Sequence, residues 1–115
     1  MKLVIAVIQP TKLDSVRDAL EKLNVTRMTV CDAQGFGRQR GQMTETPDTD
    51  SEPKVLRKVA LEVTVNDDFI ERTVDTIMRV ARSGPDGAIG DGKIFVVPSE
   101  EAVQIDDGAR GPGAV

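Results

Sequence analysis

The chain has 115 residues, with one cysteine, no histidine, and three phenylalanines as its only aromatic residues. This length suits a single domain with an aliphatic core, and the net charge of −4 argues against nucleic-acid binding. The lone Cys31 excludes an internal disulfide, as expected in a reducing, cytoplasmic compartment. Without histidine, His-based catalysis is excluded and a zinc site is not expected.

The first part of the chain reads as a strand, a helix and a second strand. Residues 3–8 are a continuous apolar run, which predicts a central strand covered on both faces and is too short to span a membrane. Apolar residues at helical spacing predict a helix over residues 12–23, with Thr11 and Asp14 as a capping pair. Residues 27–36 predict a strand with two different faces. We expect one face to carry Met28, Val30 and Ala33, and the other Thr29, Cys31 and Gln34.

The next segment, residues 41–54, is polar and contains two prolines. Such a segment buries little surface, so we expect a mobile loop. Its carboxylates cannot hold a catalytic geometry unaided, and a solubilising charged loop is the simpler interpretation. Residues 55–65 resume the strand pattern and are expected to pair with residues 27–36 as a hairpin with an oversized tip.

The last part predicts a helix and a strand. Asn66 or Asp67 is expected to cap the helix, which ends at Gly84. Residues 94–97 predict a short final strand, and the tail from Asp107 onward is expected to be poorly ordered. The order β-α-β-β-α-β predicts an α+β, ferredoxin-like fold with an antiparallel sheet.

Two glycine-rich loops adjoin these strands. Residues 35–41, Gly-Phe-Gly-Arg-Gln-Arg-Gly, combine close backbone approach with cationic side chains, as in an anion cradle. Residues 90–93, Gly-Asp-Gly-Lys, are a second such loop. The simpler interpretations are a strand-end turn or β-bulge for the first and an ordinary β-turn with an exposed lysine for the second. Together the loops favour a nucleotide-phosphate site.

Two single residues have competing interpretations. Lys58 follows the polar loop, where its ammonium could pair a carboxylate ligand; the alternative is a solvated lysine at a strand edge. Cys31 is interpreted as a half-buried strand residue. No set of residues on a rigid element resembles an active site, so we expect a protein that is not an enzyme.

These motifs resemble the P-II family of nitrogen-regulatory signal-transduction proteins over nearly the whole chain. The resemblance is carried by residues 12–20, 28–30, 35–41 and 89–96. It implies one domain over residues 1–115 that assembles as a homotrimer. The implied segments of this domain are a flexible T-loop at about 38–56, a loop before the last strand at 83–93 and a C-terminal segment at 98–115.

The resemblance also implies binding of ATP or ADP between subunits. The first glycine loop of one subunit would face the second glycine loop and the C-terminal segment of the next. The implied nucleotide contacts are Thr29, Gly35, Gly37, Arg38, Gln39, Thr64, Gly90, Asp91, Gly92 and Lys93. By the same resemblance, Gln39 would coordinate Mg²⁺ with ATP, and Gln39, Gly41 and Lys58 would bind 2-oxoglutarate.

The chain departs from the family pattern in three places. Ser51 stands where many bacterial members carry the uridylylated tyrosine, and the chain has no tyrosine, which leaves phosphorylation of Ser51 as an unsupported option. Residues 85–88 lengthen the second glycine loop. Gln104 and Asp106 replace two arginines that commonly bind phosphates, which favours ADP or AMP or weakens binding generally, unless Arg110 compensates by folding back.

The implied function is a non-enzymatic regulator that senses adenine nucleotides. It would control a membrane transporter or a metabolic enzyme through its T-loop, in nitrogen or carbon metabolism. One alternative is a constitutive trimeric adaptor with a vestigial nucleotide site, and another is a small nucleotide hydrolase on the same fold. Neither nucleic-acid binding nor membrane insertion is expected.

Overall fold

The computed structural model describes residues 1–37 and 54–115. Its main elements are β1 (Lys2–Ile8), α1 (Leu13–Glu21), β2 (Thr29–Gly37), β3 (Lys54–Val65), α2 (Ile70–Ala81) and β4 (Gly92–Pro98). The predicted β-α-β-β-α-β order is therefore confirmed. A short 3-10 turn precedes each helix, and a third one follows the last strand, at Pro10–Lys12, Asp67–Phe69 and Gly111–Ala114.

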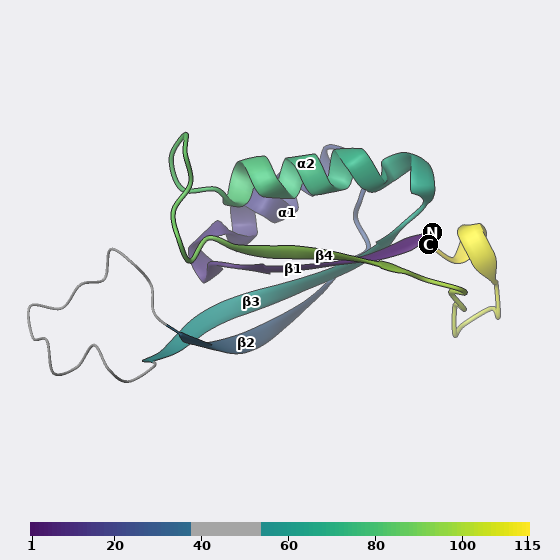
Figure 1. Ribbon diagram of the computed structural model, residues 1–115. Helices are drawn as coiled ribbons and strands as arrows, with labels where there is room; N and C mark the ends of the chain where they lie inside the picture. Colours follow the sequence, from purple (N-terminus) through teal and green to yellow (C-terminus); the bar gives the residue numbers. More distant parts are fainter. Residues whose placement is uncertain (38–53) are drawn as a thin grey trace, which may run out of the picture.

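The strands form one antiparallel sheet in the order β2-β3-β1-β4, and both helices pack on the same face of it (Figure 1). The central strand β1 places Ile5 between Glu62 of β3 and Phe95 of β4. Strands β2 and β3 form the predicted hairpin, with Thr29 opposite Glu62. The α+β, ferredoxin-like architecture predicted from the order of elements is confirmed.

The core fills the space between the helices and the sheet. Its strand residues alternate along each strand, while its helix residues recur with the helical period, so the two sets face each other. The buried members are Val4, Ala6, Ile8, Val16, Leu20, Val25, Val59, Leu61, Val63, Val65, Ile77 and Ala81. All of them are aliphatic, as the composition predicts.

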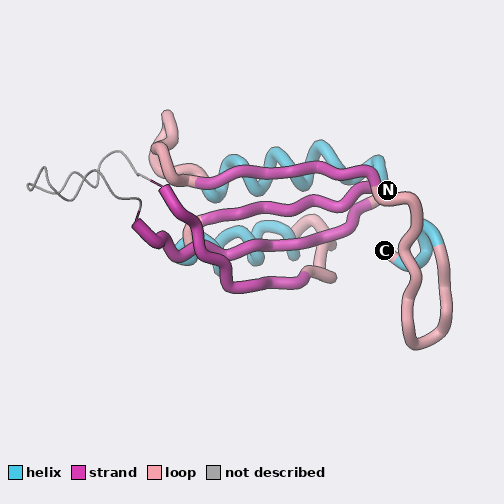
Figure 2. The backbone as a smooth tube through the Cα atoms, turned by 60° about the horizontal axis from the view of Figure 1, so that its bottom comes forward, coloured by secondary structure: helices cyan, strands magenta, loops and turns pink. Residues whose placement is uncertain are grey.

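The other face of the sheet has no described element over it (Figure 2). Here Leu3, Ile5 and Val7 of β1 are only half-buried, and Phe95 and Val97 of β4 are 50% and 42% exposed. The prediction that β1 is covered on both faces is therefore wrong for a single chain. The part of this face formed by β1 and β4 is thus a contiguous apolar patch, which is typical of a surface that becomes buried on association.

The register of β2 corrects the predicted faces of two residues. The pairing with β3 is regular from Thr29 to Gly37, so side chains alternate without interruption. Ala33 therefore lies on the uncovered face with Thr29, and Gln34 lies on the helix side with Val30. Cys31 is exposed rather than half-buried, because it shares the uncovered face.

The predicted caps and several boundaries also differ. No side chain caps either helix, because a 3-10 turn begins each one and supplies backbone hydrogen bonds instead. Asp67 contacts the amino group of Met1 rather than a helix end. Strand β3 begins at Lys54, so residues 54–56 of the expected T-loop belong to the strand, and β4 begins at Gly92 rather than at residue 94.

The C-terminal segment is folded, contrary to the expectation of poor order. Val103 forms a β-bridge with Arg110, and the amide of Gln104 donates to the carbonyl oxygen of Ala109 at 2.8 Å. Gly108 has a φ of +71°, a conformation that glycine adopts without strain, and this allows the chain to turn back. The segment thus forms a small hairpin beyond the end of the sheet (Figure 1).

Candidate functional site

One end of the sheet brings together Gly35, from the described part of the first glycine-rich stretch, and the second glycine-rich loop of the same chain. Gly35, near the end of β2, lies beside Lys58 of β3: a Cβ added to Gly35 would stand 3.7 Å from Cγ of Lys58. The Lys58 ammonium donates to the carbonyl oxygen of Gly90 at 2.6 Å, and the Gln9 amide donates to the same oxygen at 2.7 Å. We call this group of residues the loop-end half-site.

Lys58 is therefore not a solvated lysine at a strand edge. Strand β3 lies inside the sheet, between β2 and β1, and the Lys58 side chain is half-buried. Its ammonium is already hydrogen-bonded within the chain, so a carboxylate ligand would have to share it with Gly90 or displace that contact.

Asp91 stabilises the second glycine loop from within. Its Oδ1 accepts from the Ser83 hydroxyl at 2.6 Å, and its Oδ2 accepts from the backbone amides of Ser83 and Ala88 at 2.9 and 2.8 Å. The Ser83 hydroxyl first, and the two amides with it, hold the pKa of Asp91 below its ordinary value of 3.8. Both carboxylate oxygens thus face the loop, which favours a structural role over the direct nucleotide contact implied by the resemblance.

Gly92 is required by the sheet itself. A Cβ at this position would lie 1.9 Å from the carbonyl oxygen of Val7, closer than atoms can approach, and its φ is +124°. Gly90, with a φ of +101°, also adopts a conformation that other residues rarely take. Packing against β1 therefore requires glycine at residue 92. At Gly90 the backbone has a different role, because its carbonyl oxygen accepts the hydrogen bond from Lys58. Lys93 follows in β4 and is exposed.

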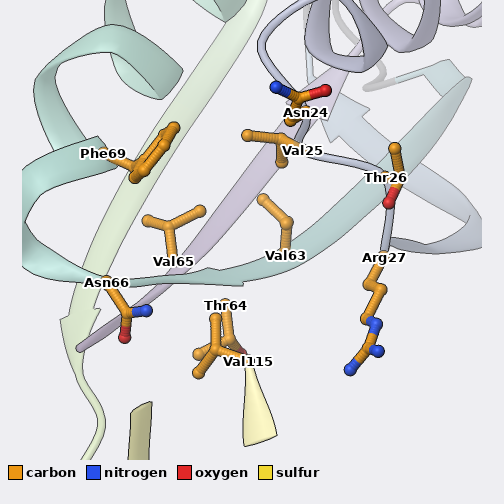
Figure 3. A pocket seen from close by; sticks show the side chains of 10 residues that line it. All are labelled: Asn24, Val25, Thr26, Arg27, Val63, Thr64, Val65, Asn66, Phe69 and Val115. Carbon is orange, nitrogen blue, oxygen red and sulfur yellow. The ribbon is translucent and has the colours of Figure 1, made fainter. Parts of the chain in front are cut away.

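The other implied nucleotide residues lie at the opposite end of the sheet. Thr29 and Thr64 line a shallow pocket of about 210 Å³ together with Leu3, Arg27, Glu62, Val63, Ala114 and Val115. A neighbouring pocket of about 240 Å³ is shown in Figure 3, where Val25, Val63 and Val65 lie near Phe69, and Arg27 extends from the connection between α1 and β2. Val115 lies beside Thr64 in both pockets. We call this group the C-terminal half-site.

Gln104 and Asp106, which stand where the resemblance implies arginines, lie at this same end. Gln104 accepts a hydrogen bond from Nη1 of Arg27 at 3.4 Å, while Asp106 is exposed and accepts from the amide of Asp107 at 2.8 Å. Arg110 does fold back, but it pairs with Glu101 at 2.5 Å. Its guanidinium is therefore already neutralised by a carboxylate within the hairpin.

The two half-sites of one chain are far apart. Lys58 and Thr64 lie on the same strand, and six residues of extended chain span about 20 Å. The loop before β4 and the C-terminal hairpin lie at opposite ends of the sheet in both views (Figures 1 and 2). Gly35 and Gly90 thus share one end of the single chain, while Thr29 and Thr64 lie at the other.

Several predicted residues lie outside the described residues, and several others were missed. Arg38, Gln39, Gly41 and Ser51 fall between residues 37 and 54, as does most of the expected T-loop. Sequence reasoning did not single out Gln9, Arg27 or Ser83, which contact Gly90, Gln104 and Asp91. No local sequence pattern marks Gln9 or Ser83. Arg27 could have been noticed because it lies two residues before Thr29.

Two features are absent from the residues that the structure describes. In residues 1–37 and 54–115, no group of three or more His, Cys, Asp or Glu side chains could hold a metal ion. Within the same ranges, neither helix has the length and apolar character needed to cross a membrane.

The sheet and helices define an α+β, ferredoxin-like protein. Comparison with known proteins refines this class, because the profile of the family "Nitrogen regulatory protein P-II" matches residues 1–109. The chain is 41% identical to the nitrogen regulatory protein GlnK1 of Methanosarcina mazei over 100% of this chain and 97% of that protein. It is also 42% identical to a nitrogen regulatory protein P-II of Bradyrhizobium diazoefficiens and 41% identical to the nitrogen regulatory protein P-II 1 of Escherichia coli (strain K12), each over 100% of both chains.

The chain belongs to the P-II family of nitrogen regulatory proteins, as the sequence motifs predicted. The family acts in signal transduction in nitrogen regulation, and its members are trimers. The relatives named above are regulatory proteins by name, which agrees with the expectation of a non-enzyme.

Proposed function

We propose that this protein is a homotrimeric regulator that binds adenine nucleotides between subunits and signals to a partner through residues 38–56. The observation that carries the proposal is the separation of the two half-sites within one chain. A nucleotide shorter than that separation cannot contact both ends of one sheet. It can contact both if the loop end of one subunit meets the C-terminal end of the next.

The uncovered face of the sheet supports the trimer. Ile5 and Phe95 lie opposite each other on it, and burial of such side chains contributes about 25 cal/mol per Å² of apolar surface. Association through this face would bring the ends of neighbouring sheets close together. The sheet face and the two half-sites thus support the same assembly.

The proposed nucleotide contacts keep the implied residues, with Asp91 moved to a supporting role. Gly35, Gly90 and Lys93 would face the phosphates, and Thr29 and Thr64 the adenosine. Gln104 and Asp106 weaken the attraction for a γ-phosphate, so we propose a preference for ADP or AMP over ATP. The partner would be a membrane transporter or a metabolic enzyme in the cytoplasm.

Binding of 2-oxoglutarate with Mg-ATP is a further part of this proposal. Gln39 and Gly41 would act with Lys58, which lies at the loop-end half-site. Because Lys58 already donates to Gly90, 2-oxoglutarate would compete with that carbonyl oxygen for the ammonium. The affinity for 2-oxoglutarate would therefore depend on whether the side-chain amide of Gln9 still donates to the Gly90 carbonyl oxygen when Lys58 binds the ligand instead.

Light scattering coupled to size exclusion, together with titration calorimetry, tests the proposal. We expect a trimer that binds ADP or AMP more tightly than ATP. Its unfolding temperature should rise when nucleotide is added, because a ligand that binds only the native state stabilises that state. Tight, ATP-selective binding would contradict the preference for ADP or AMP. A trimer that neither binds nor is stabilised by any adenine nucleotide would instead be the constitutive adaptor, which the pairing of Arg110 with Glu101 favours.

A further inference from the structure

Arg27 is a cation that the C-terminal half-site contains without a carboxylate partner in the described ranges 1–37 and 54–115. It lies on the exposed connection between α1 and β2. Other cations near this end are engaged: the Met1 amino group contacts Asp67, Lys2 lies 4.0 Å from the same carboxylate, Arg110 lies 2.5 Å from Glu101, and the Arg72 guanidinium lies over the Phe69 ring. Arg27 therefore keeps its charge available at this end of the sheet.

The partner of Arg27 strengthens this interpretation. Nη1 of Arg27 donates to Oε1 of Gln104 at 3.4 Å. Because the amide oxygen faces Arg27, the Nε2 group of Gln104 remains able to donate elsewhere. The two side chains together offer one positive charge and one neutral donor, at an end where the family pattern places arginines on the C-terminal segment.

The position of Arg27 indicates which part of a nucleotide it reaches. It lines the same pocket as Thr29, Glu62 and Thr64. Glu62 accepts hydrogen bonds only, which suits ribose hydroxyls and repels phosphate, whereas a guanidinium matches phosphate oxygens. A cation beside the adenosine residues can reach the first phosphate, while the second and third would extend toward the loop end of the neighbouring subunit.

We propose that Arg27 binds the α-phosphate of an adenine nucleotide and replaces the charge missing at residues 104 and 106. This inference rests on the proposed nucleotide-binding function. It makes the adenosine monophosphate unit the portion of the ligand that the C-terminal half-site recognises. AMP, ADP and ATP would then share the contact between Arg27 and the α-phosphate. The β- and γ-phosphates would gain less affinity than arginines at residues 104 and 106 would give them.

The test compares Arg27→Gln with the wild-type trimer by titration calorimetry using AMP, ADP and ATP. Loss of a charge-assisted hydrogen bond costs about tenfold or more in affinity, and we expect similar losses for all three nucleotides because they share the α-phosphate. Lys93→Gln, at the loop end, should weaken ATP and ADP more than AMP. Arg27→Lys should retain part of the affinity.

Arg110→Gln is the matched control, because it removes an exposed arginine at the same end that is already paired with Glu101. It should leave all three affinities unchanged. Wild-type affinity for AMP in Arg27→Gln would overturn the inference while the proposed function stands. Failure of the wild-type protein to bind any adenine nucleotide would overturn both. Equal unfolding temperatures of the apo proteins would show that the loss of affinity is not a folding defect.

Discussion

The ammonium of Lys58 donates a hydrogen bond to the carbonyl oxygen of Gly90 at 2.6 Å, joining two segments that are 32 residues apart in the chain. The contact ties the base of the β2–β3 hairpin to the loop before β4. Under the proposed function, a ligand bound at Lys58 would therefore act on both segments, including the hairpin from which the expected T-loop continues.

Replacing Lys58 separates its structural role from its proposed ligand role. We expect Lys58→Met to loosen the loop before β4, because a charge-assisted hydrogen bond contributes about 1.5–3 kcal/mol, and to abolish any response to 2-oxoglutarate. Gln9→Leu, which removes the second donor to Gly90, should loosen the loop without abolishing that response. Hydrogen exchange of loop amides and calorimetry with 2-oxoglutarate in Mg-ATP measure the two effects. A 2-oxoglutarate response that survives Lys58→Met would exclude Lys58 as the ligand-binding residue.

Removal of the Asp91 carboxylate should release the second glycine loop. Asp91→Ala eliminates three hydrogen bonds, so faster exchange is expected at the amides of Ser83 and Ala88, with the sheet unaffected. Asp86, in the same loop, is exposed, and Asp86→Ala serves as the control. Unchanged exchange at Ser83 in the Asp91 variant would show that the carboxylate does not order the loop.

The same carboxylate predicts a pH dependence. Folding lowers the pKa of Asp91, chiefly through the Ser83 hydroxyl, so the ionised form is the one that stabilises the loop. Its contribution is complete above the ordinary value of 3.8 and is lost as the pH falls through the lower folded value. NMR titration of the Ser83 and Ala88 amides should therefore show a midpoint below 3.8. A midpoint above that value would contradict the hydrogen-bonding arrangement.

Gly92→Ala should destabilise the sheet. The added Cβ would stand 1.9 Å from the Val7 carbonyl oxygen, and relieving such a clash requires β4 to move away from β1. We expect a loss of about 3 kcal/mol in the free energy of unfolding, measured by urea denaturation. Gly113→Ala has no atom within 4 Å of its Cβ and should change stability little. Equal stabilities of the two variants would disprove the steric requirement at Gly92.

A charge on the uncovered sheet face should dissociate the proposed trimer. Phe95→Asp places a carboxylate among apolar side chains that association would bury, and an unpaired buried charge is strongly unfavourable. Light scattering should report a monomer. Met78→Asp, on the outer helix layer and 46% exposed, is the matched control and should remain trimeric. A trimeric Phe95 variant would place the subunit interface elsewhere.

Sequence patterns predicted most of the fold because they depend on short-range periodicity. The hairpin of β2 and β3 and the order of elements are confirmed. The faces of Ala33 and Gln34 were wrong because each lies three residues from the residue it was grouped with, Val30 and Cys31, and an odd spacing puts side chains on opposite faces of an uninterrupted strand. The caps were wrong because 3-10 turns supplied backbone hydrogen bonds that sequence reasoning had assigned to side chains.

The sequence by itself determined the aliphatic core, the alternation of elements and the family, since each depends on residue types at fixed spacing along the chain. Only the tertiary structure decided that Gly35, Lys58 and Gly90 share one end of the sheet and that Arg27 meets Gln104 at the other. It also decided that Asp91 faces its own loop. The physical reason is that such contacts join residues distant in sequence, whose proximity follows from strand order and register rather than from any local pattern.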